Sequence, residues 1–359
     1  MKTLYIHASL TFGGGVGSVV KNLIEKELIN DNLVYLCGPQ EDKIKKISNG
    51  FAENCKTLIL KKNKSFIPNI VRGTNILKIY NELKKNYPMY RVILICHCPG
   101  IIGFCGKIPK NTFVVLHGHI YNDGKKITKY FYKKLFSKLS KQCVFVSCSK
   151  ECGEYYLEHF NLKSRVITNG VSQESKKHVR KGNNFTIGFV GPLWNHKGYQ
   201  FVIDAIEHIE IRDYHISILF AGVNQDNFDF LSINSDKVFV EYLGLVPDLS
   251  KKMSELFDIV VLPSLMEGLP MSLLESISLS IPVLATQVGG IPEIVQDGIN
   301  GYFIQRDGFD IAQKIMWCAD WNNYQKLQKG CEDIYKQGFD SDVMNTQYEL
   351  LFNEFKLGE

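Results

Sequence analysis

The sequence alternates short apolar runs with longer segments of helical periodicity, and this order constrains the fold more than any other feature. The runs in the first half are rich in Val, Ile, Leu and aromatic residues, as parallel strands buried on both faces are. Segments with helical spacing lie between several of them, at 19–29 and 75–85 for example. Such alternation builds right-handed βαβ units and therefore a doubly wound parallel sheet. The six runs are 4–8, 32–37, 56–60, 91–96, 112–117 and 142–147.

The second half begins the same pattern again. Strand-like runs lie at 185–191, 215–222, 237–244, 258–263 and 281–286, with helical patterns at 198–209 and 270–280. A length of 359 residues suits two domains. The prediction is two Rossmann-like αβα domains facing across a cleft. Their bounds are 1–172, a polar linker or surface loop at 173–184, a second domain at 185–339, and a helix at 340–359 that packs back toward the first domain, with Asp340 as its N-cap.

Composition excludes several classes of protein. Apolar residues make up 45% and charged residues 22% of the chain, so a disordered or fibrous protein is excluded. We expect neither a membrane-spanning helix nor a signal peptide, and we therefore predict a cytoplasmic protein. Residues 1–175 carry 27 Lys and Arg against 12 Asp and Glu, whereas residues 176–359 carry 15 against 25. The basic first half suggests an anionic partner, although a solvated lysine-rich surface would have the same composition.

The ten cysteines are scattered and form no Cys-x-x-Cys pair, so they are interpreted as buried free thiols of a reducing compartment. Cys96-His97-Cys98 lacks the second pair of ligands that a tetrahedral zinc site needs. The Asp-x-Asp at 340–342 precedes a helix and is interpreted as a cap. We predict no metal ion and no other cofactor. The sequence also contains no basic-aromatic sheet motif or zinc finger, so nucleic acid is not an expected partner.

A glycine-rich loop at 13–18 follows the first strand and precedes a helix. Glycines such as Gly14 and Gly15 let the backbone approach a ligand and expose helix amides to an anion. The third glycine of a dinucleotide fingerprint is missing, because position 20 is Val20. The loop is interpreted as a phosphate or sugar contact, with a structural tight turn as the alternative.

The richest segment is Pro263–Glu275, where a strand ends and a helix begins. The backbone is bare at Gly268, so the Gly268 and Leu269 amides should point outward at the positive end of the helix dipole, where a diphosphate can bind. Glu275 lies on the face opposite the buried leucines and suits a ribose diol. Glu267, in the loop, suits the hydroxyls of a hexose. Alternatively, both glutamates are solvated surface charges.

Two further elements flank this segment in the chain. Gly191-Pro192-Leu193-Trp194-Asn195-His196-Lys197-Gly198 follows the first strand of the second domain, and Val288–Val295, with Gly289-Gly290 and Glu293, follows the strand after Glu275's helix. Together these motifs resemble the C-terminal domain of the GT-B glycosyltransferases, specifically glycosyltransferase family 4. The resemblance is strong over about 185–305 and weaker in the first domain, where it rests on the glycine-rich loop and the strand ending Leu116-His117-Gly118-His119.

The resemblance implies a retaining glycosyltransferase that moves a hexose or N-acetylhexosamine from a nucleotide-sugar. The expected donor is a UDP-sugar. Its acceptor would be a glycan or a lipid-linked glycan of bacterial surface polysaccharide synthesis. It assigns the catalytic positions to His117, Glu267 and Lys197, with a satisfied strand-end histidine as the alternative for His117. It assigns donor binding to Gly14, Gly15, Gly191, Lys197, Glu267, Gly268, Leu269 and Glu275.

One position departs from the family pattern. The family has an arginine one residue after the glycine of this strand, and here that residue is Pro192. Stabilisation of the leaving group then rests on Lys197 and the helix amides. Two alternative functions remain open: a nucleotide-sugar epimerase or hydrolase of the same fold, and a nucleotide-sugar-binding protein without catalysis.

The segment 125–141 has apolar residues at helical spacing, with lysines along the other side. This pattern is typical of an amphipathic helix that lies on an anionic membrane, which would make the protein peripheral on the inner face of the cytoplasmic membrane. A helix that faces the core and exposes its lysines has the same pattern. The two interpretations differ in where Ile127, Phe131, Leu135 and Leu139 are buried.

Overall fold

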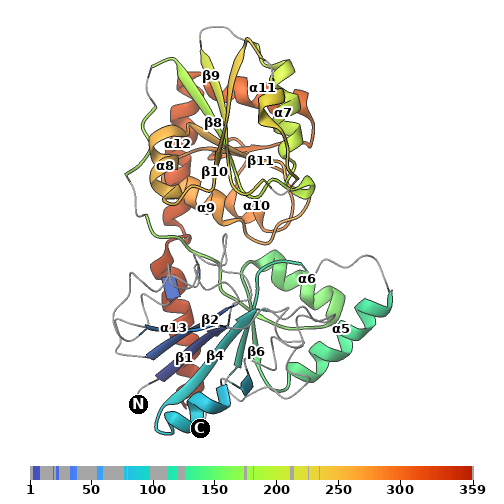
Figure 1. Cartoon of the computed structure of the whole chain (residues 1–359), viewed down its shortest axis with the longest axis vertical. Coiled ribbons are helices and arrows are strands. Elements are labelled where there is room, and N and C mark those ends of the chain that lie inside the picture. Colours follow the sequence, from blue (N-terminus) through green and yellow to red (C-terminus); the bar gives the residue numbers. More distant parts are fainter. Residues whose placement is uncertain are drawn as a thin grey trace. The chain divides into compact units, whose positions relative to one another are not determined.

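The computed structural model divides into two compact units, Met1–Asn169 with Asp342–Glu359, and Gly170–Ser341. It describes residues 3–8, 19, 22–23, 33–38, 55–59, 77–78, 80–97, 112–119, 126–173, 176–180, 182–210, 214–224, 226–233 and 235–357. Each unit is built on a parallel sheet with helices, as Figure 1 shows. The predicted α/β class with two Rossmann-like units is therefore confirmed, and we describe each unit by itself.

The first unit contains a seven-stranded sheet in the order β3-β2-β1-β4-β5-β6-β7. Every described strand pair is parallel, so the carboxyl ends of these strands meet at one edge. The sequence did not predict the last strand, which has only two residues. The strands are β1 (Thr3–Ala8), β2 (Leu33–Gly38), β3 (Cys55–Ile59), β4 (Arg91–His97), β5 (Thr112–Leu116), β6 (Val144–Ser147) and β7 (Arg165–Val166).

Three labelled helices belong to this unit. Helices α5 (Lys126–Leu139) and α6 (Lys150–Phe160) contact each other (Figure 1). Helix α13 (Ser341–Leu357) packs on the sheet through Phe352, whose ring lies 5.5 Å from that of Tyr5 and 4.9 Å from that of Phe113. Helical residues 77–78 and 80–86 overlap the segment predicted as a helix at 75–85 and extend one residue beyond it.

Helix α5 turns apolar side chains toward its own unit. Phe136 and Leu139 are fully buried, and the Phe136 ring meets those of Phe145, Tyr156 and Phe160. Its described lysines, in contrast, are exposed. The core-facing interpretation thus accounts for this part of the helix, while the side chains of Ile127 and Phe131 lie outside the described residues.

The second unit contains a six-stranded parallel sheet in the order β10-β9-β8-β11-β12-β13. Figure 1 shows α7 and α11 on one face of this sheet and α8, α9 and α12 on the other. The strands are β8 (Asn184–Val190), β9 (His215–Ala221), β10 (Val238–Gly244), β11 (Ile259–Leu262), β12 (Val283–Ala285) and β13 (Gly301–Phe303). The helices are α7 (Tyr199–His208), α8 (Leu249–Leu256), α9 (Met271–Ser278), α10 (Ile291–Ile294), α11 (Gly308–Ala319) and α12 (Trp321–Lys336), with short 3-10 turns η2 (Asn195–Lys197) and η3 (Phe230–Ser232).

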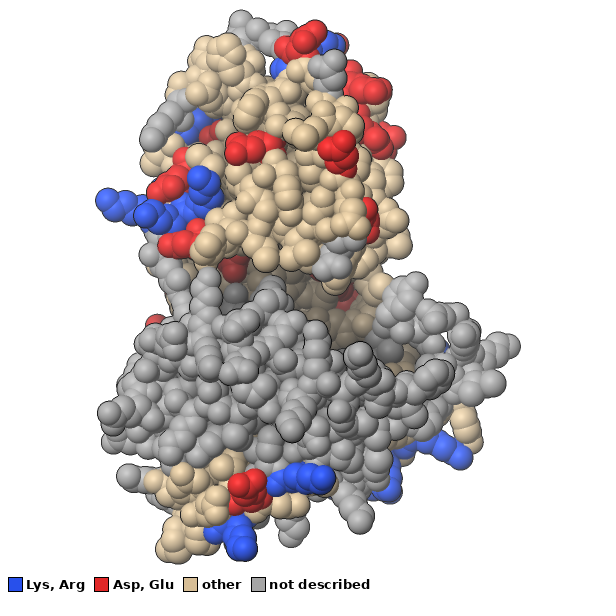
Figure 2. Space-filling model, in the orientation of Figure 1, with Lys and Arg blue, Asp and Glu red and all other residues tan. Residues whose placement is uncertain are grey.

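The second unit is acidic, as the composition of the second half of the chain indicates, and Figure 2 shows acidic side chains spread over it.

The central strands β8, β9 and β11 are almost entirely buried, because helices cover both faces. The sequence missed β13, since Gly301-Tyr302-Phe303 is too short to show a period.

Most described residues of the segment predicted as a linker, 173–184, are exposed, but two of its side chains are buried. His178 and Arg180 are each 5% exposed. His178 places Nδ1 2.9 Å from the Ser254 carbonyl and Nε2 2.9 Å from Asp258 Oδ1, so both ring nitrogens meet acceptors. Arg180 donates to the Ala319 carbonyl at 2.6 Å and lies over four aromatic rings, those of Phe185, Tyr214, Trp321 and Tyr324. The composition indicates an exposed segment, and specific partners nevertheless bury these two side chains in the second unit.

We predict that Asp258→Ala lowers the free energy of unfolding by about 1–3 kcal/mol, because it leaves Nε2 of the buried His178 ring without its hydrogen-bond partner. The substitution also removes the carboxylate oxygen that accepts from the Thr186 amide at 2.7 Å. Urea unfolding measures the change. Glu241→Ala, at an exposed position of β10, is the matched control and should change stability by less than about 0.5 kcal/mol. Equal stabilities of the two variants would contradict a structural role for the pair.

Candidate functional site

The turn between β11 and α9, residues 263–270, forms the centre of the site. Glu267 is 8% exposed and is the focus of two hydrogen bonds at one oxygen. The Lys197 ammonium donates to Glu267 Oε1 at 2.6 Å, and the Ser264 hydroxyl donates to the same oxygen at 2.6 Å. Oε2 has no hydrogen-bond partner among the described residues, so it can accept from a ligand hydroxyl.

Two glycines, one before the turn in the sequence and one after it, lie in close contact with the backbone of the turn. Gly198 has φ +76°, and a Cβ there would lie 2.1 Å from the carbonyl oxygen of Pro263. Gly289 has φ +54°, and a Cβ there would lie 2.0 Å from the carbonyl oxygen of Glu267. Only glycine combines these backbone angles with such close approaches. The Lys-Gly and Gly-Gly motifs of the sequence therefore have a physical reason, which is to let two loops touch the backbone of the turn.

Backbone hydrogen bonds complete the packing of the turn. The Leu265 amide donates to the His196 carbonyl at 2.7 Å, and the Gly290 amide donates to the Gly268 carbonyl at 2.7 Å. The Thr286 hydroxyl donates to the Ser264 carbonyl at 2.6 Å. The turn is thus tied to the loops after β8 and β12, and its shape is fixed by residues far away in sequence.

The start of α9 provides donors for an anion. Pro270 is the N-cap, one residue before the position predicted from the sequence, and the Leu273 amide bonds to its carbonyl at 3.1 Å. Among the described residues, the Gly268 and Leu269 amides donate to no backbone carbonyl. They lie immediately before the positive end of an eight-residue helix, where an anion such as a diphosphate is favoured.

Glu275 lies one turn into α9 and is half-buried, as is Ser272, on the side away from the sheet core. Leu273, Leu274 and Ile277 are fully buried on the other side. This placement leaves the Glu275 carboxylate on the accessible face of the helix that begins at the amide donors.

The loop after β8 carries Gly191 and Lys197. The Gly191 amide bonds to the Ala221 carbonyl at 2.9 Å, and no described atom lies within 4 Å of the place where a Cβ would stand. Burial and the Lys197 charge lower the pKa of His196, so this ring adds no positive charge near pH 7. Lys197 is therefore the cation that this loop presents beside Glu267.

The sequence did not single out two residues that shape this site. Ser264 bonds to Glu267, and Arg306, which follows β13, donates to the Asn195 carbonyl at 2.9 Å while lying over the Phe201 ring at 4.9 Å. The sequence could have indicated the role of Ser264, since this residue lies three residues before Glu267 in the same turn. It could not have indicated the contact of Arg306, because the partner is 111 positions away.

The remaining predicted residues belong to the first unit. His117 directly follows β5 and is half-buried at the carboxyl end of that sheet. Gly14 and Gly15 lie outside the described residues, as do the side chains of Cys96-His97-Cys98. Six predicted positions belong to the second unit, and the structure gathers them at the carboxyl edge of its sheet: Gly191, Lys197, Glu267, Gly268, Leu269 and Glu275.

Within the described part of the chain, no helix is long and apolar enough to cross a membrane.

Comparison with known proteins gives a consistent family. Residues 184–320 match the family described as "Glycosyl transferases group 1". An uncharacterised 41.2 kDa protein in the cps region of Klebsiella pneumoniae is 24% identical, with 96% of this chain and 98% of that protein covered. An Escherichia coli enzyme, UDP-Gal:alpha-D-GlcNAc-diphosphoundecaprenol alpha-1,3-galactosyltransferase, is 25% identical, with 76% of this chain and 79% of that protein covered.

A solved structure extends the likeness to the whole fold. The crystal structure of Anabaena HepE in complex with UDP superposes with a TM-score of 0.75 at 16% identity, over 99% of this chain and 100% of that one. At this identity the likeness establishes the fold. Since the motif set, the matched region and the fold agree, residues 184–320 match the group 1 glycosyl transferases, and the chain is a glycosyltransferase with the GT-B fold.

Proposed function

We propose that this glycosyltransferase moves a hexose or N-acetylhexosamine from a UDP-sugar to a glycan or lipid-linked glycan, with retention of configuration, in bacterial surface polysaccharide synthesis. One observation carries the proposal. Lys197, Glu267 and Ser264 form a buried hydrogen-bonded cluster directly beside the Gly268 and Leu269 amides at the start of α9. A cation, a hydroxyl acceptor and bare amides are the groups that a sugar diphosphate needs.

The chemistry of the leaving group fits this cluster. Breaking the bond between the sugar and the phosphate builds negative charge on the diphosphate and positive character on the sugar carbon. The Gly268 and Leu269 amides and the Lys197 ammonium stabilise the growing negative charge, and they are fixed before the reaction begins. Because Pro192 replaces the arginine of the family pattern, this charge falls on Lys197 and the amides, and we expect no metal ion to be needed.

Retention is proposed to proceed by attack of the acceptor hydroxyl on the face from which the diphosphate leaves. The acceptor oxygen forms its bond to the sugar carbon as the bond to phosphate breaks with its electron pair. The proton of that hydroxyl passes to the departing phosphate oxygen. Glu267 holds hydroxyls of the donor hexose, and Glu275 holds the ribose diol.

The first unit is proposed to contribute His117, which would contact the donor sugar near the reacting carbon, and the backbone at Gly14 and Gly15. Exclusion of water from the reacting groups would let the acceptor hydroxyl attack. These roles follow from the family resemblance.

The donor and pathway find support in the relatives. The name of the Escherichia coli enzyme states a UDP-galactose donor and a lipid diphosphate acceptor, and HepE was crystallised with UDP. The Klebsiella relative is encoded in a cps region, which is consistent with capsule synthesis. An epimerase or hydrolase would consume donor without an acceptor, and a pure binding protein would consume none, so a donor-only assay separates these alternatives.

The proposal is tested by thermal shift with UDP-, GDP- and ADP-sugars, followed by transfer assays. We expect a UDP-sugar to raise the melting temperature, since it binds the folded protein alone. Transfer is then measured to farnesyl diphosphates of N-acetylglucosamine, glucose and galactose, with and without EDTA. Binding of no UDP-sugar, or transfer to none of these acceptors, would overturn the proposal. Loss of turnover in EDTA would overturn its metal independence.

We predict that Glu275→Ala weakens UDP binding by roughly 10- to 100-fold, because two hydroxyl hydrogen bonds to a charged acceptor are lost. Isothermal titration with UDP measures the affinity. Glu255→Ala, at an exposed position of α8 in the same unit, is the charge-matched control and should bind UDP as the wild type does. Unchanged affinity in Glu275→Ala would contradict the assignment to the ribose.

Glu267→Ala is predicted to lower kcat by roughly 100-fold, since the donor sugar and Lys197 both lose the group that positions them. UDP affinity should change much less than turnover, because the diphosphate amides remain. Glu267→Gln keeps an oxygen for Ser264 and Lys197 and controls for folding. The assignment fails if affinity for UDP and turnover fall together in both variants.

A peripheral contact with anionic membrane is also proposed, through the exposed lysines of α5. Helix α5 exposes Lys129, Lys133, Lys134 and Lys138, and Lys141 follows it. Because Phe136 and Leu139 are buried in the unit, the contact would be electrostatic rather than by insertion of those residues. Each lysine near an anionic surface contributes about 1 kcal/mol.

We therefore predict that Lys133→Glu with Lys138→Glu reduces binding to phosphatidylglycerol vesicles by roughly tenfold or more. Co-sedimentation measures binding, and phosphatidylcholine vesicles give the baseline. Lys326→Glu with Lys329→Glu, on exposed positions of α12, makes the same change of charge in the second unit. Equal losses in the two double variants would show that net charge alone governs binding and would rule out a specific role for α5.

A further inference from the structure

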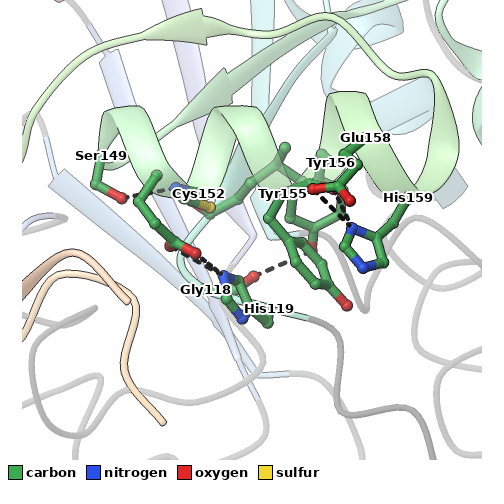
Figure 3. Close-up of polar contacts among 10 residues, drawn as sticks. Gly118, His119, Ser149, Cys152, Tyr155, Tyr156, Glu158 and His159 are labelled. Carbon is green, nitrogen blue, oxygen red and sulfur yellow. Dashed lines mark hydrogen bonds and ion pairs between the residues drawn. The ribbon is translucent and has the colours of Figure 1, made fainter. Parts of the chain in front are cut away.

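The first unit contains a cluster of rings around His119 that has no role in the proposed donor site. His119 Nε2 lies 2.7 and 2.9 Å from the two carboxylate oxygens of Glu151. Figure 3 shows His119 close to Tyr155, which belongs to α6. The His119 ring stacks on Tyr155 at 3.8 Å and 12°, and Tyr155 stacks in turn on His159 at 4.5 Å and 22°. Residues 151, 155 and 159 recur at four-residue spacing, so one stripe of α6 receives the His119 side chain.

This cluster lies where ligands of a parallel sheet bind. His119 comes three residues after the end of β5, and Glu151 is in the first turn of α6, which follows β6. Strands β5 and β6 are neighbours in the sheet, so both residues lie at the carboxyl ends of adjacent strands. Crevices outside this edge are the usual binding places of doubly wound folds.

The His119 side chain is held firmly. The Tyr156 hydroxyl donates to the Gly118 carbonyl at 3.1 Å and anchors the preceding residue to α6. Burial and the Glu151 charge raise the pKa of Tyr155, so the ring against which His119 stacks remains a neutral phenol. The imidazole is thus fixed on one face by stacking and at one nitrogen by a carboxylate.

The hydrogen-bond pattern determines the role of each ring nitrogen. A carboxylate only accepts, so Nε2 carries the hydrogen that points to Glu151. A neutral ring then presents the lone pair of Nδ1, which makes no hydrogen bond within the described part of the chain. The His119 side chain is 18% exposed. A carboxylate that fixes the tautomer and orientation of a histidine is a recurrent device of functional sites.

We propose that His119 Nδ1 accepts a hydrogen bond from a hydroxyl of the acceptor sugar that does not itself react, with Glu151 as the positioning residue. The inference rests on the proposed function and deepens it. The reacting hydroxyl has one hydrogen, which passes to the leaving phosphate, so His119 must bind a different hydroxyl. His119 lies two residues from His117, at most about 7 Å along the backbone, which is about the span of one sugar ring. The acceptor is therefore a sugar with a hydroxyl near the one that attacks.

The test uses the best of the three farnesyl diphosphate sugars and its monodeoxy analogues. His119→Phe keeps the ring that stacks on Tyr155 and removes both nitrogens. We expect it to raise the KM for the acceptor by roughly three- to tenfold while UDP affinity stays unchanged. One deoxy analogue should raise the acceptor KM of the wild type by the same factor and leave the acceptor KM of His119→Phe unchanged. This is expected because the missing hydroxyl and the missing imidazole are the two partners of one hydrogen bond.

Two variants of α6 separate positioning from folding. Glu151→Ala should raise the acceptor KM as His119→Phe does, whereas Glu151→Gln keeps an oxygen for Nε2–H and should stay within about threefold of the wild type. Glu154→Gln, exposed on the same helix, is the matched control and should change nothing.

The outcomes are distinguishable. If the wild type transfers sugar to none of the acceptors, the proposed function fails and this inference fails with it. A second outcome is that the wild type transfers sugar, His119→Phe has the wild-type acceptor KM, and each deoxy analogue raises that KM equally in both proteins. In that case the inference alone is overturned.

Discussion

The proposed donor site depends on a backbone contact that only glycine permits. The turn at 263–270 must hold the buried Glu267 carboxylate and keep the Gly268 and Leu269 amides free of backbone hydrogen bonds. An isolated loop would meet neither condition. Gly198 and Gly289 approach the carbonyls of Pro263 and Glu267 so closely that any side chain would collide. The turn is therefore clamped between two loops, and the amides before α9 keep their orientation because the chain around them cannot relax. Preorganised donors of this kind stabilise charge without reorganising during a reaction.

The charge at the centre of the turn is balanced within the second unit. A carboxylate as buried as Glu267 is costly without a partner, and Lys197 and Ser264 supply one hydrogen bond each to the same oxygen. This arrangement satisfies the acid and leaves its second oxygen for a ligand. It also fixes the Lys197 ammonium close to the amide donors, although the unit as a whole is acidic. Local hydrogen-bond donors for an anion thus come from one lysine and the helix start rather than from net charge.

The sequence predicted those parts of the fold and site that depend on local order. Apolar runs gave β8, β9, β10 and β11 to within about a residue or two, and the proline and glycines around α9 marked a bare turn before a helix. It failed where partners are distant. In the segment at 173–184 it did not indicate the burial of His178 and Arg180, because their partners Asp258 and Ala319 lie 80 and 139 positions away. Strand β13 was missed because three residues carry no period.

The same distinction applies to the polar side chains of the two units. The role of a backbone amide follows from its place before a helix, so Gly268 and Leu269 were visible as anion donors from the sequence alone. The role of a side chain depends on what faces it across the fold. His119 is an ordinary polar residue in a loop until Glu151, 32 positions later, meets its Nε2 and Tyr155 meets its ring. Glu151 determines that Nε2 carries a hydrogen, and in the neutral ring the other nitrogen is then an acceptor. A sugar hydroxyl can be recognised only by a group whose donor or acceptor character is fixed in advance, and in the first unit this character is set by tertiary structure.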